Sequence, residues 1–288
     1  MFEISLWLIF VLIAALVRGL NSFLVKVISH KELDSSSIFL IQMCIASIVL
    51  LFFIDFNKLE ILYTTPIMLY TSIIGLSLFY HKKLSVLVLK DVSSTIMFIS
   101  TRVFPSILLL FISIFLFGDS LTIMELVGLG VGVLTLLFLY DPTDTAKEGS
   151  NFKRGIFYLS GNIITGTLLI VFIALSISID ILYTLFLYSF FCFLFFSIES
   201  IYTKKFTFTN LKNLENIRFG ALFALFFTIA NYFLFLALDL GNIAIVYKIF
   251  SFEIFIPIVL SMILYKEKIT IKKIVAISLA ILSIVFFI

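Results

Sequence analysis

The sequence predicts an all-α integral membrane protein with ten transmembrane helices in two inverted five-helix repeats. Three observations lead to this fold class: an apolar composition, a series of long apolar runs, and a turn motif that occurs twice. Of the 288 residues, 62% are apolar and 13% are charged, whereas about 25% of the residues in soluble domains are charged. A soluble core could not bury this much apolar surface, so we expect lipid to solvate much of the chain.

Long apolar runs supply the expected transmembrane elements. Each run has roughly 18 to 25 residues, enough to cross a hydrocarbon core of about 30 Å as a helix, and only helices satisfy their own backbone in lipid segment by segment. In chain order, the spans cover residues 4–27, 36–54, 66–89, 93–117, 122–140, 155–178, 181–202, 217–238, 243–264 and 271–288. The first span has no basic leader and no small-residue cleavage site, so we expect a retained helix rather than a signal peptide.

The turn between the fourth and fifth spans occurs again near the end of the chain. Residues 115–128 read FLFGDSLTIMELVG and residues 263–276 read ILYKEKITIKKIVA, which aligns Asp119 with Glu267 at a separation of 148 residues. Similarity at a fixed distance indicates a duplication. Both carboxylates lie at expected helix starts, where they complement the helix dipole, so we interpret them as structural rather than as transport groups.

The duplication divides the chain into two halves and a linker. We expect the first repeat, the linker and the second repeat at residues 1–141, 142–154 and 155–288. If the loops are numbered alternately, one face of the membrane receives fourteen Lys and Arg residues and the other receives only Lys58. The positive-inside rule then predicts a cytoplasmic linker and two external termini. Because each half has an odd number of spans, the second half is inverted relative to the first, as in many secondary transporters with a midplane substrate site.

Three motifs resemble those of a known family. The turns GDSLTIMELVG and KEKITIKKIVA are similar to a Gly-Glu-x-(Leu/Ile)-(Ser/Thr) turn, RGLNSFLVK at 18–26 is similar to a first-helix motif Trp-Gly-x-Asn followed by a basic residue, and Pro105 resembles a fourth-helix proline. All three are features of the EamA branch of the drug/metabolite transporter (DMT) superfamily. The resemblance covers the whole chain and implies ten helices in two inverted halves.

The sequence also departs from the family pattern. Arg18 stands where the family usually has Trp, and Gln42 occupies a second-helix position where Arg is common. Asp119 replaces the usual Glu, and Pro257 is not in register with the family proline of the second half.

Charged residues inside the apolar spans mark the expected binding site. A charge at a helix centre costs about 2.5–3.5 kcal/mol on insertion scales, so such residues usually face a bundle interior or a wet cavity. Arg102 lies roughly 14 Å into the fourth span, near the midplane, and Glu253 lies at a similar depth in the ninth. We expect this pair at the centre of a substrate or gating site, with positive charges around it. The candidate substrate-binding residues are Arg102, Glu253, Lys82, Lys83, His81, Lys248, Arg18, Asn231, Tyr247 and Tyr80.

Each candidate also has a structural alternative. Lys82 and Lys83 could extend to the headgroups, and Arg102 with Glu253 could form a purely structural ion pair. His81, Lys82 and Lys83 spread over roughly 200° of helix arc, so not all three can face one cavity. Asn231, Tyr247 and Tyr80 could equally be satisfied within the bundle.

The function most consistent with these features is secondary transport. An excess of buried positive charge favours a small anionic or zwitterionic metabolite, such as an amino acid or a phosphorylated or carboxylated compound. The alternatives are an exporter of lipophilic or cationic compounds and a flippase for a lipid-linked metabolite. We expect no enzymatic activity, with an integral membrane enzyme as the distant alternative, since His30 and His81 are the only histidines and no zinc motif accompanies them. A primary pump would need a phosphate-binding loop of the form G-x-x-x-x-G-K-(S/T), and the sequence contains none.

Partners and location follow from this function. We expect a multi-pass protein of the cell inner (cytoplasmic) membrane that contacts the lipid bilayer and a small-molecule substrate, with a proton as the candidate coupling ion. We expect no nucleic acid, no cofactor and no metal, and a monomer or homodimer.

Overall fold

The structure is a computed structural model, and it describes residues 6–55, 65–112, 123–139, 151–176, 180–203, 213–240, 246, 249–266 and 270–286. Nearly all of these residues are helical, and no strand occurs among them. The helices are α1 Leu6–Lys31, α2 Ser35–Leu51, α3 Thr65–Asp91, α4 Ser94–Ile112, α5 Ile123–Leu139, α6 Phe152–Ser176, α7 Ile181–Tyr202, α9 Leu214–Leu240, the 3₁₀ turn η3 Phe252–Ile254, α11 Phe255–Tyr265 and α12 Ile271–Phe286.

The all-helical, apolar character of the prediction is confirmed. Five of the described helices are long and apolar enough to cross a membrane: α1, α3, α6, α7 and α9. Shorter apolar helices cover residues 35–51, 249–265 and 274–283. The number of crossings and the division into two repeats stay predictions.

Side-chain caps fix where several helices begin. Asp34 precedes α2, and its carboxylate accepts hydrogen bonds from the backbone N–H and the hydroxyl of Ser37 at 3.5 and 2.6 Å. Asp180 precedes α7 and accepts from the N–H groups of Leu182 and Tyr183 at 3.0 and 3.5 Å. These bonds satisfy N–H groups that have no partner within the first helical turn.

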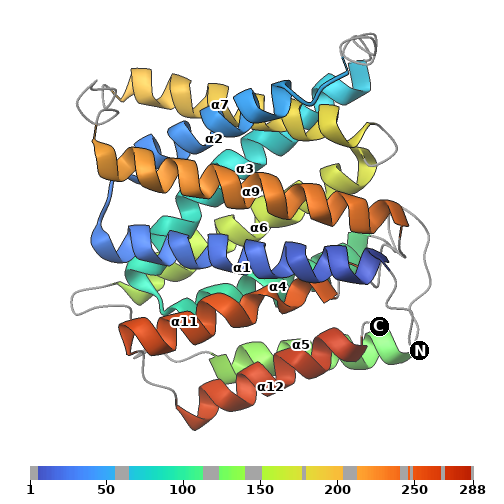
Figure 1. The fold of residues 1–288 in the computed structure, drawn as a ribbon. Coiled ribbons are helices and arrows are strands. Elements are labelled where there is room, and N and C mark those ends of the chain that lie inside the picture. The colour runs from blue at the N-terminus through green and yellow to red at the C-terminus, as the bar shows by residue number, and fades with distance from the viewer. Residues whose placement is uncertain are drawn as a thin grey trace.

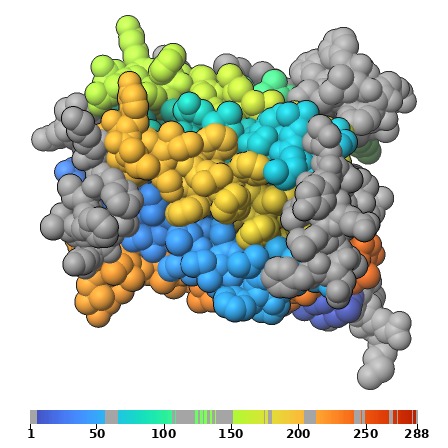
Figure 2. All heavy atoms as spheres, turned by 90° about the horizontal axis from the view of Figure 1, so that it is seen from above, coloured from blue at the N-terminus to red at the C-terminus, as the bar shows by residue number. Residues whose placement is uncertain are grey.

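The helices lie side by side along one direction and form a bundle (Figure 1). Helices α2 and α7 lie along one edge and α5 and α12 along the opposite edge, while α1 begins and α12 ends at the same end of the bundle. Figure 2 shows the face on which α2, α3 and α7 pack together. The central helices α1, α3, α4, α6, α9 and α11 enclose the interior.

The helix contacts occur in pairs. Helix α3 packs on α6 and α1 on α9; α3 packs on α7 and α2 on α9; α4 packs on α6 and α1 on α11. In addition, α2 packs on α7 and α5 on α12. Small residues permit the closest of these approaches: a Cβ atom added at Gly19 of α1 would lie 2.7 Å from the carbonyl oxygen of Glu253.

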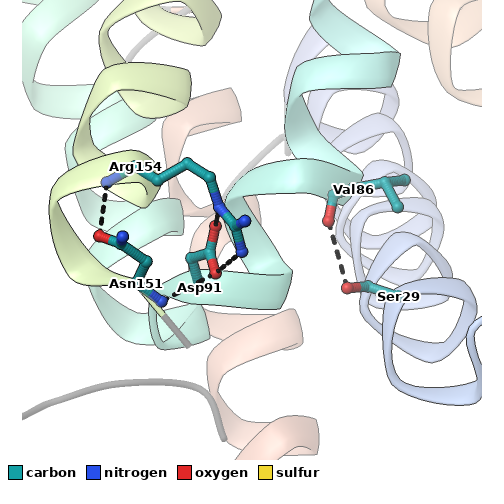
Figure 3. Close-up of polar contacts among 5 residues, drawn as sticks. All are labelled: Ser29, Val86, Asp91, Asn151 and Arg154. Carbon is teal, nitrogen blue, oxygen red and sulfur yellow. Dashed lines mark hydrogen bonds and ion pairs between the residues drawn. The ribbon is translucent and has the colours of Figure 1, made fainter. Parts of the chain in front are cut away.

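A polar joint connects the end of α3 to the start of α6 (Figure 3). The Arg154 guanidinium donates from Nε and Nη2 to the two carboxylate oxygens of Asp91, each at 2.7 Å. Asn151 caps α6 by accepting the Arg154 N–H at 3.2 Å, and its own N–H donates to Asp91 at 3.1 Å. Beside this joint, the Ser29 hydroxyl donates to the Val86 carbonyl at 3.2 Å and links α1 to α3.

Candidate binding cavity

A cavity of about 130 Å³ lies among α1, α3, α4, α6, α9 and the η3–α11 segment. Its wall combines apolar side chains with a set of polar ones. The charged and polar lining residues are Arg18, Asn21, Ser22, His81, Lys82, Ser85, Thr101, Arg102, Asn231 and Glu253. Three of these side chains are basic (Arg18, Lys82 and Arg102) and one is a carboxylate (Glu253), so basic groups outnumber acidic groups in the wall.

Arg102 and Glu253 form an ion pair across the cavity wall, as the sequence predicts. Arg102 extends from α4 and Glu253 from η3, and the Glu253 side chain is only 2% exposed. The Arg102 guanidinium also lies 5.8 Å from the ring centroid of Phe250, within the range of a cation–π contact. Glu253 Oε2 has no hydrogen-bond donor among the described residues.

Pro105 lines the cavity one turn after Arg102. Because proline has no N–H, it cannot donate to the carbonyl oxygen four residues earlier, which is that of Thr101. In the same turn, the Thr101 hydroxyl donates to the Phe98 carbonyl at 3.1 Å. The proline therefore interrupts the regular hydrogen bonding of α4 beside the charged pair.

Lys82 lies in a cage of aromatic side chains. Its Nζ atom donates to Gln42 Oε1 at 2.9 Å and lies 4.8, 5.7 and 5.7 Å from the ring centroids of Phe39, Phe223 and Phe227. Gln42 is oriented by a second bond, from its Nε2 to the Phe223 carbonyl at 3.5 Å. The residue is 6% exposed, so the ammonium group is held in the interior rather than at a headgroup.

Arg18 contributes the third cationic side chain of the wall. It extends from α1, is half-buried, and lines the same cavity as Lys82. Neither Arg18 nor Lys82 has a carboxylate within ion-pair distance in the part of the chain that the structure describes. Their charges are therefore not compensated by the protein there.

His81 and Asn231 are the remaining residues of the predicted binding site that line the cavity. His81 Nδ1 lies 3.2 Å from the carbonyl oxygen of Asn162, and since a carbonyl can only accept, this nitrogen carries the hydrogen. Asn162 returns the contact by donating to the His81 carbonyl at 2.8 Å and to the Ser85 hydroxyl at 2.9 Å. Asn231 donates to the Phe227 carbonyl one turn earlier, at 2.7 Å.

Four predicted residues are not placed in this wall. Lys83 points toward α7, where it pairs with Glu199 and lies 5.3 Å from the Phe79 ring centroid. Tyr80 is 48% exposed on the outer face of α3. The predicted divergence of His81, Lys82 and Lys83 is thus observed, because successive residues project about 100° apart around a helix. Tyr247 and Lys248 lie outside the described residues, as do Asp119 and Glu267.

Asn21 is a lining residue that the sequence prediction did not include. It is 4% exposed, and its Oδ1 atom has no hydrogen-bond donor among the described residues. A signal was present in the sequence, since Asn21 lies three residues after Arg18 on the same face of an apolar helix. Gln42, the hydrogen-bond partner of Lys82, could not be assigned because it comes from a separate helix. Within the described residues, no group of three His, Cys, Asp or Glu side chains could hold a metal ion.

Comparisons with known proteins agree with this arrangement. A family model described as the EamA-like transporter family matches residues 5–141, which confirms the family suggested by the motifs. The fold is similar to that of a protein of known crystal structure, with a TM-score of 0.61 and 14% identity over 94% of this chain and 96% of the other. At this identity the likeness shows the fold alone. No match is found among curated proteins.

Proposed function

Through residues 5–141 the chain belongs to the EamA-like transporter family, and we propose that it carries a small organic anion or zwitterion across the cytoplasmic membrane by alternating access. Family membership and the apolar helices make it a multi-pass membrane protein of a transporter family. The substrate class and the mechanism are our proposals, and they rest on the cavity described above.

One observation carries the substrate proposal: a polar, positively charged cavity lies in the interior of an apolar bundle. Its wall contains Arg18, Lys82 and Arg102 but a single carboxylate. In a medium of low dielectric constant, such an excess of charge is unfavourable until an anion enters. A carboxylate or phosphate group would accept hydrogen bonds from these donors, and a guanidinium can bind either group through two parallel bonds.

Two acceptors in the same wall favour a substrate that also donates hydrogen bonds. Glu253 Oε2 and Asn21 Oδ1 are buried without donors among the described residues. A buried acceptor without a partner costs about 1–3 kcal/mol. An amino or hydroxyl group on the substrate would satisfy these atoms, so a zwitterion or a hydroxylated anion fits better than a simple fatty acid.

The paired helix contacts support alternating access between two inverted halves. Under exchange of the predicted halves, α1 corresponds to α6, α2 to α7, α3 to α9, α4 to α11 and α5 to α12. The contact of α1 with α9 then corresponds to that of α6 with α3, and the contacts of α2 with α9 and α1 with α11 also have counterparts. Two such halves can rock about a shared site to expose it to either side.

Coupling to a proton is part of the proposal. Protonation of Glu253 would remove the carboxylate that neutralises Arg102 and would leave that guanidinium to bind the substrate. The charged group that faces Glu253 most closely is Arg102, with Arg18 and Lys82 in the same wall.

A transport screen tests the proposed function. The purified full chain is reconstituted in proteoliposomes and supplied in turn with radiolabelled carboxylates, phosphate esters, amino acids and lipophilic cations. We expect accumulation of one or more of the anionic or zwitterionic compounds and none of the cations. Transport of lipophilic cations alone, or movement of lipid-linked compounds alone, would contradict the proposal.

A further inference from the structure

Resting on the proposed function, we propose that the cavity is specific for small dianions: its substrate carries two negative charges on the side that faces Arg18 and Lys82. The charges of the wall and the size of the cavity lead to this inference.

The pair Arg102–Glu253 is internally neutral and leaves the other two cations to be compensated. Glu253 is the only carboxylate in the cavity wall among the described residues, and it forms its ion pair with Arg102. A second ion pair, Lys83 with Glu199, also involves a residue of α3 but lies outside the cavity. Arg18 and Lys82 therefore leave a formal excess of two positive charges in the wall.

The side chains around Lys82 solvate part of its ammonium group but supply no negative charge to neutralise it. An ammonium group has three N–H donors, and one of them is used by Gln42. The rings of Phe39, Phe223 and Phe227 offer their negative faces, which attract a cation but do not neutralise it. The donors that remain are available to a ligand in the cavity that Lys82 lines.

Arg18 supplies a second set of donors from α1. Its guanidinium has five N–H groups in a planar fork, and it lines the same cavity as Lys82. A group of charge −1 would compensate one of the two cations and leave the other buried. A ligand of charge −2 would compensate both, so a dianion gains more than a monoanion of the same shape.

The cavity volume limits the size of the ligand. An apolar cavity of about 150 Å³ holds a benzene molecule, and this cavity has about 130 Å³. A ligand on the order of five to eight non-hydrogen atoms therefore fits. Inorganic phosphate, sulfate and short dicarboxylates are of this size, whereas a nucleotide or a lipid headgroup is larger.

Sulfate and methanesulfonate provide the test, because they have nearly the same shape but carry charges of −2 and −1 at all working pH values. Binding of each to the purified full chain is measured by isothermal titration in detergent at constant ionic strength. We expect sulfate to bind about tenfold or more tightly than methanesulfonate, since a hydrogen bond to a charged group contributes about this factor. Equal affinities would overturn the proposal.

Three variants test whether Arg18 and Lys82 cause the preference for sulfate over methanesulfonate. Arg18→Gln and Lys82→Gln should each reduce the preference for sulfate to less than about threefold. Arg18→Lys keeps the charge and should keep most of the preference, which separates a role in charge from a role in folding. Lys83→Gln is the matched control: it removes a neighbouring lysine that lies outside the cavity and should leave the preference unchanged. A preference that survives Arg18→Gln and Lys82→Gln would overturn the assignment.

The outcomes also separate this inference from the proposed function. If both anions bind equally and both are lost in Lys82→Gln, the dianion inference fails while an anion transporter is still supported. If neither anion binds and the transport screen accumulates only cations, the proposed function fails as well.

Discussion

Arg102 and Glu253 are the residues on which the proposed site depends most. They come from α4 and η3 and form an ion pair next to a cavity, with one carboxylate oxygen left without a donor. Removing one partner of a buried pair costs about 3–5 kcal/mol, whereas replacing both by apolar residues is often neutral. The pair can thus be tested for function separately from its contribution to folding.

Arg102→Lys is predicted to abolish transport while the protein stays folded in the membrane. Lysine keeps the charge but presents a point charge in place of a planar fork, so it cannot bind a carboxylate through two parallel bonds. Uptake into proteoliposomes measures the effect, and the elution profile of the purified variant in detergent reports folding.

The double variant Arg102→Met with Glu253→Leu distinguishes the two roles of the pair. If the pair is functional, this variant folds but does not transport. If the pair is purely structural, the variant folds and transports, and that result would count against a role in the site.

At the scale of helices, the positions of the helices along the chain could be predicted from the sequence, whereas the packing partners of each face of α3 could not. Apolar runs located the helices to within a few residues; the expected span 217–238, for example, lies within α9 at Leu214–Leu240. Equal depths in repeat-related spans predicted the contact between Arg102 and Glu253. The position of Lys83 could not be predicted, because it depends on α7 packing against α3 from outside the cavity.

Gly19→Ala is predicted to destabilise the contact between α1 and the η3–α11 segment. The new methyl group would lie 2.7 Å from the Glu253 carbonyl oxygen and 2.6 Å from Ile256 Cδ1, so the two elements must move apart. Gly130→Ala is the control, since an added Cβ there meets no heavy atom within 4 Å, and alanine favours a helix by about 0.5–1 kcal/mol. We expect a lower unfolding temperature for the first variant and an equal or higher one for the second.

Asp91→Asn is predicted to weaken the joint between α3 and α6. Asparagine presents one carbonyl oxygen in place of two carboxylate oxygens, so it cannot accept both bonds from Arg154. Thermal unfolding in detergent should begin at a lower temperature than in the wild type. Lys153→Gln, on the exposed neighbour of Arg154, should leave the unfolding temperature unchanged; an equal effect of both variants would contradict a specific role for Asp91.

At the scale of the whole molecule, the bundle consists of apolar helices around a charged interior. α1 begins and α12 ends at the same end of the bundle (Figure 1), which agrees with an even number of crossings. The substrate could not be predicted from the sequence, because the cavity wall combines side chains from six separate segments, α1, α3, α4, α6, α9 and η3–α11. Positive charge in the spans favours only the sign of charge that we propose for the substrate.

Topology is predicted from the distribution of Lys and Arg: the linker at 142–154 is cytoplasmic and both termini are external. Single cysteines are introduced at Lys147 and at Lys58 in a variant without Cys44 and Cys192. A membrane-impermeant maleimide added to intact cells should label position 58 and not position 147. Labelling of position 147 from outside would reverse the assignment.

Transport by variants of the cavity wall tests the central claim most directly. Uptake of the radiolabelled anion identified in the screen is measured in proteoliposomes for the wild type, for Arg18→Gln combined with Lys82→Gln, and for Lys83→Gln. If the cavity is the transport site, Lys83→Gln retains the wild-type rate and the double variant loses transport while it elutes as a folded protein. Wild-type uptake by the folded double variant would show that the anion crosses elsewhere and would contradict the account.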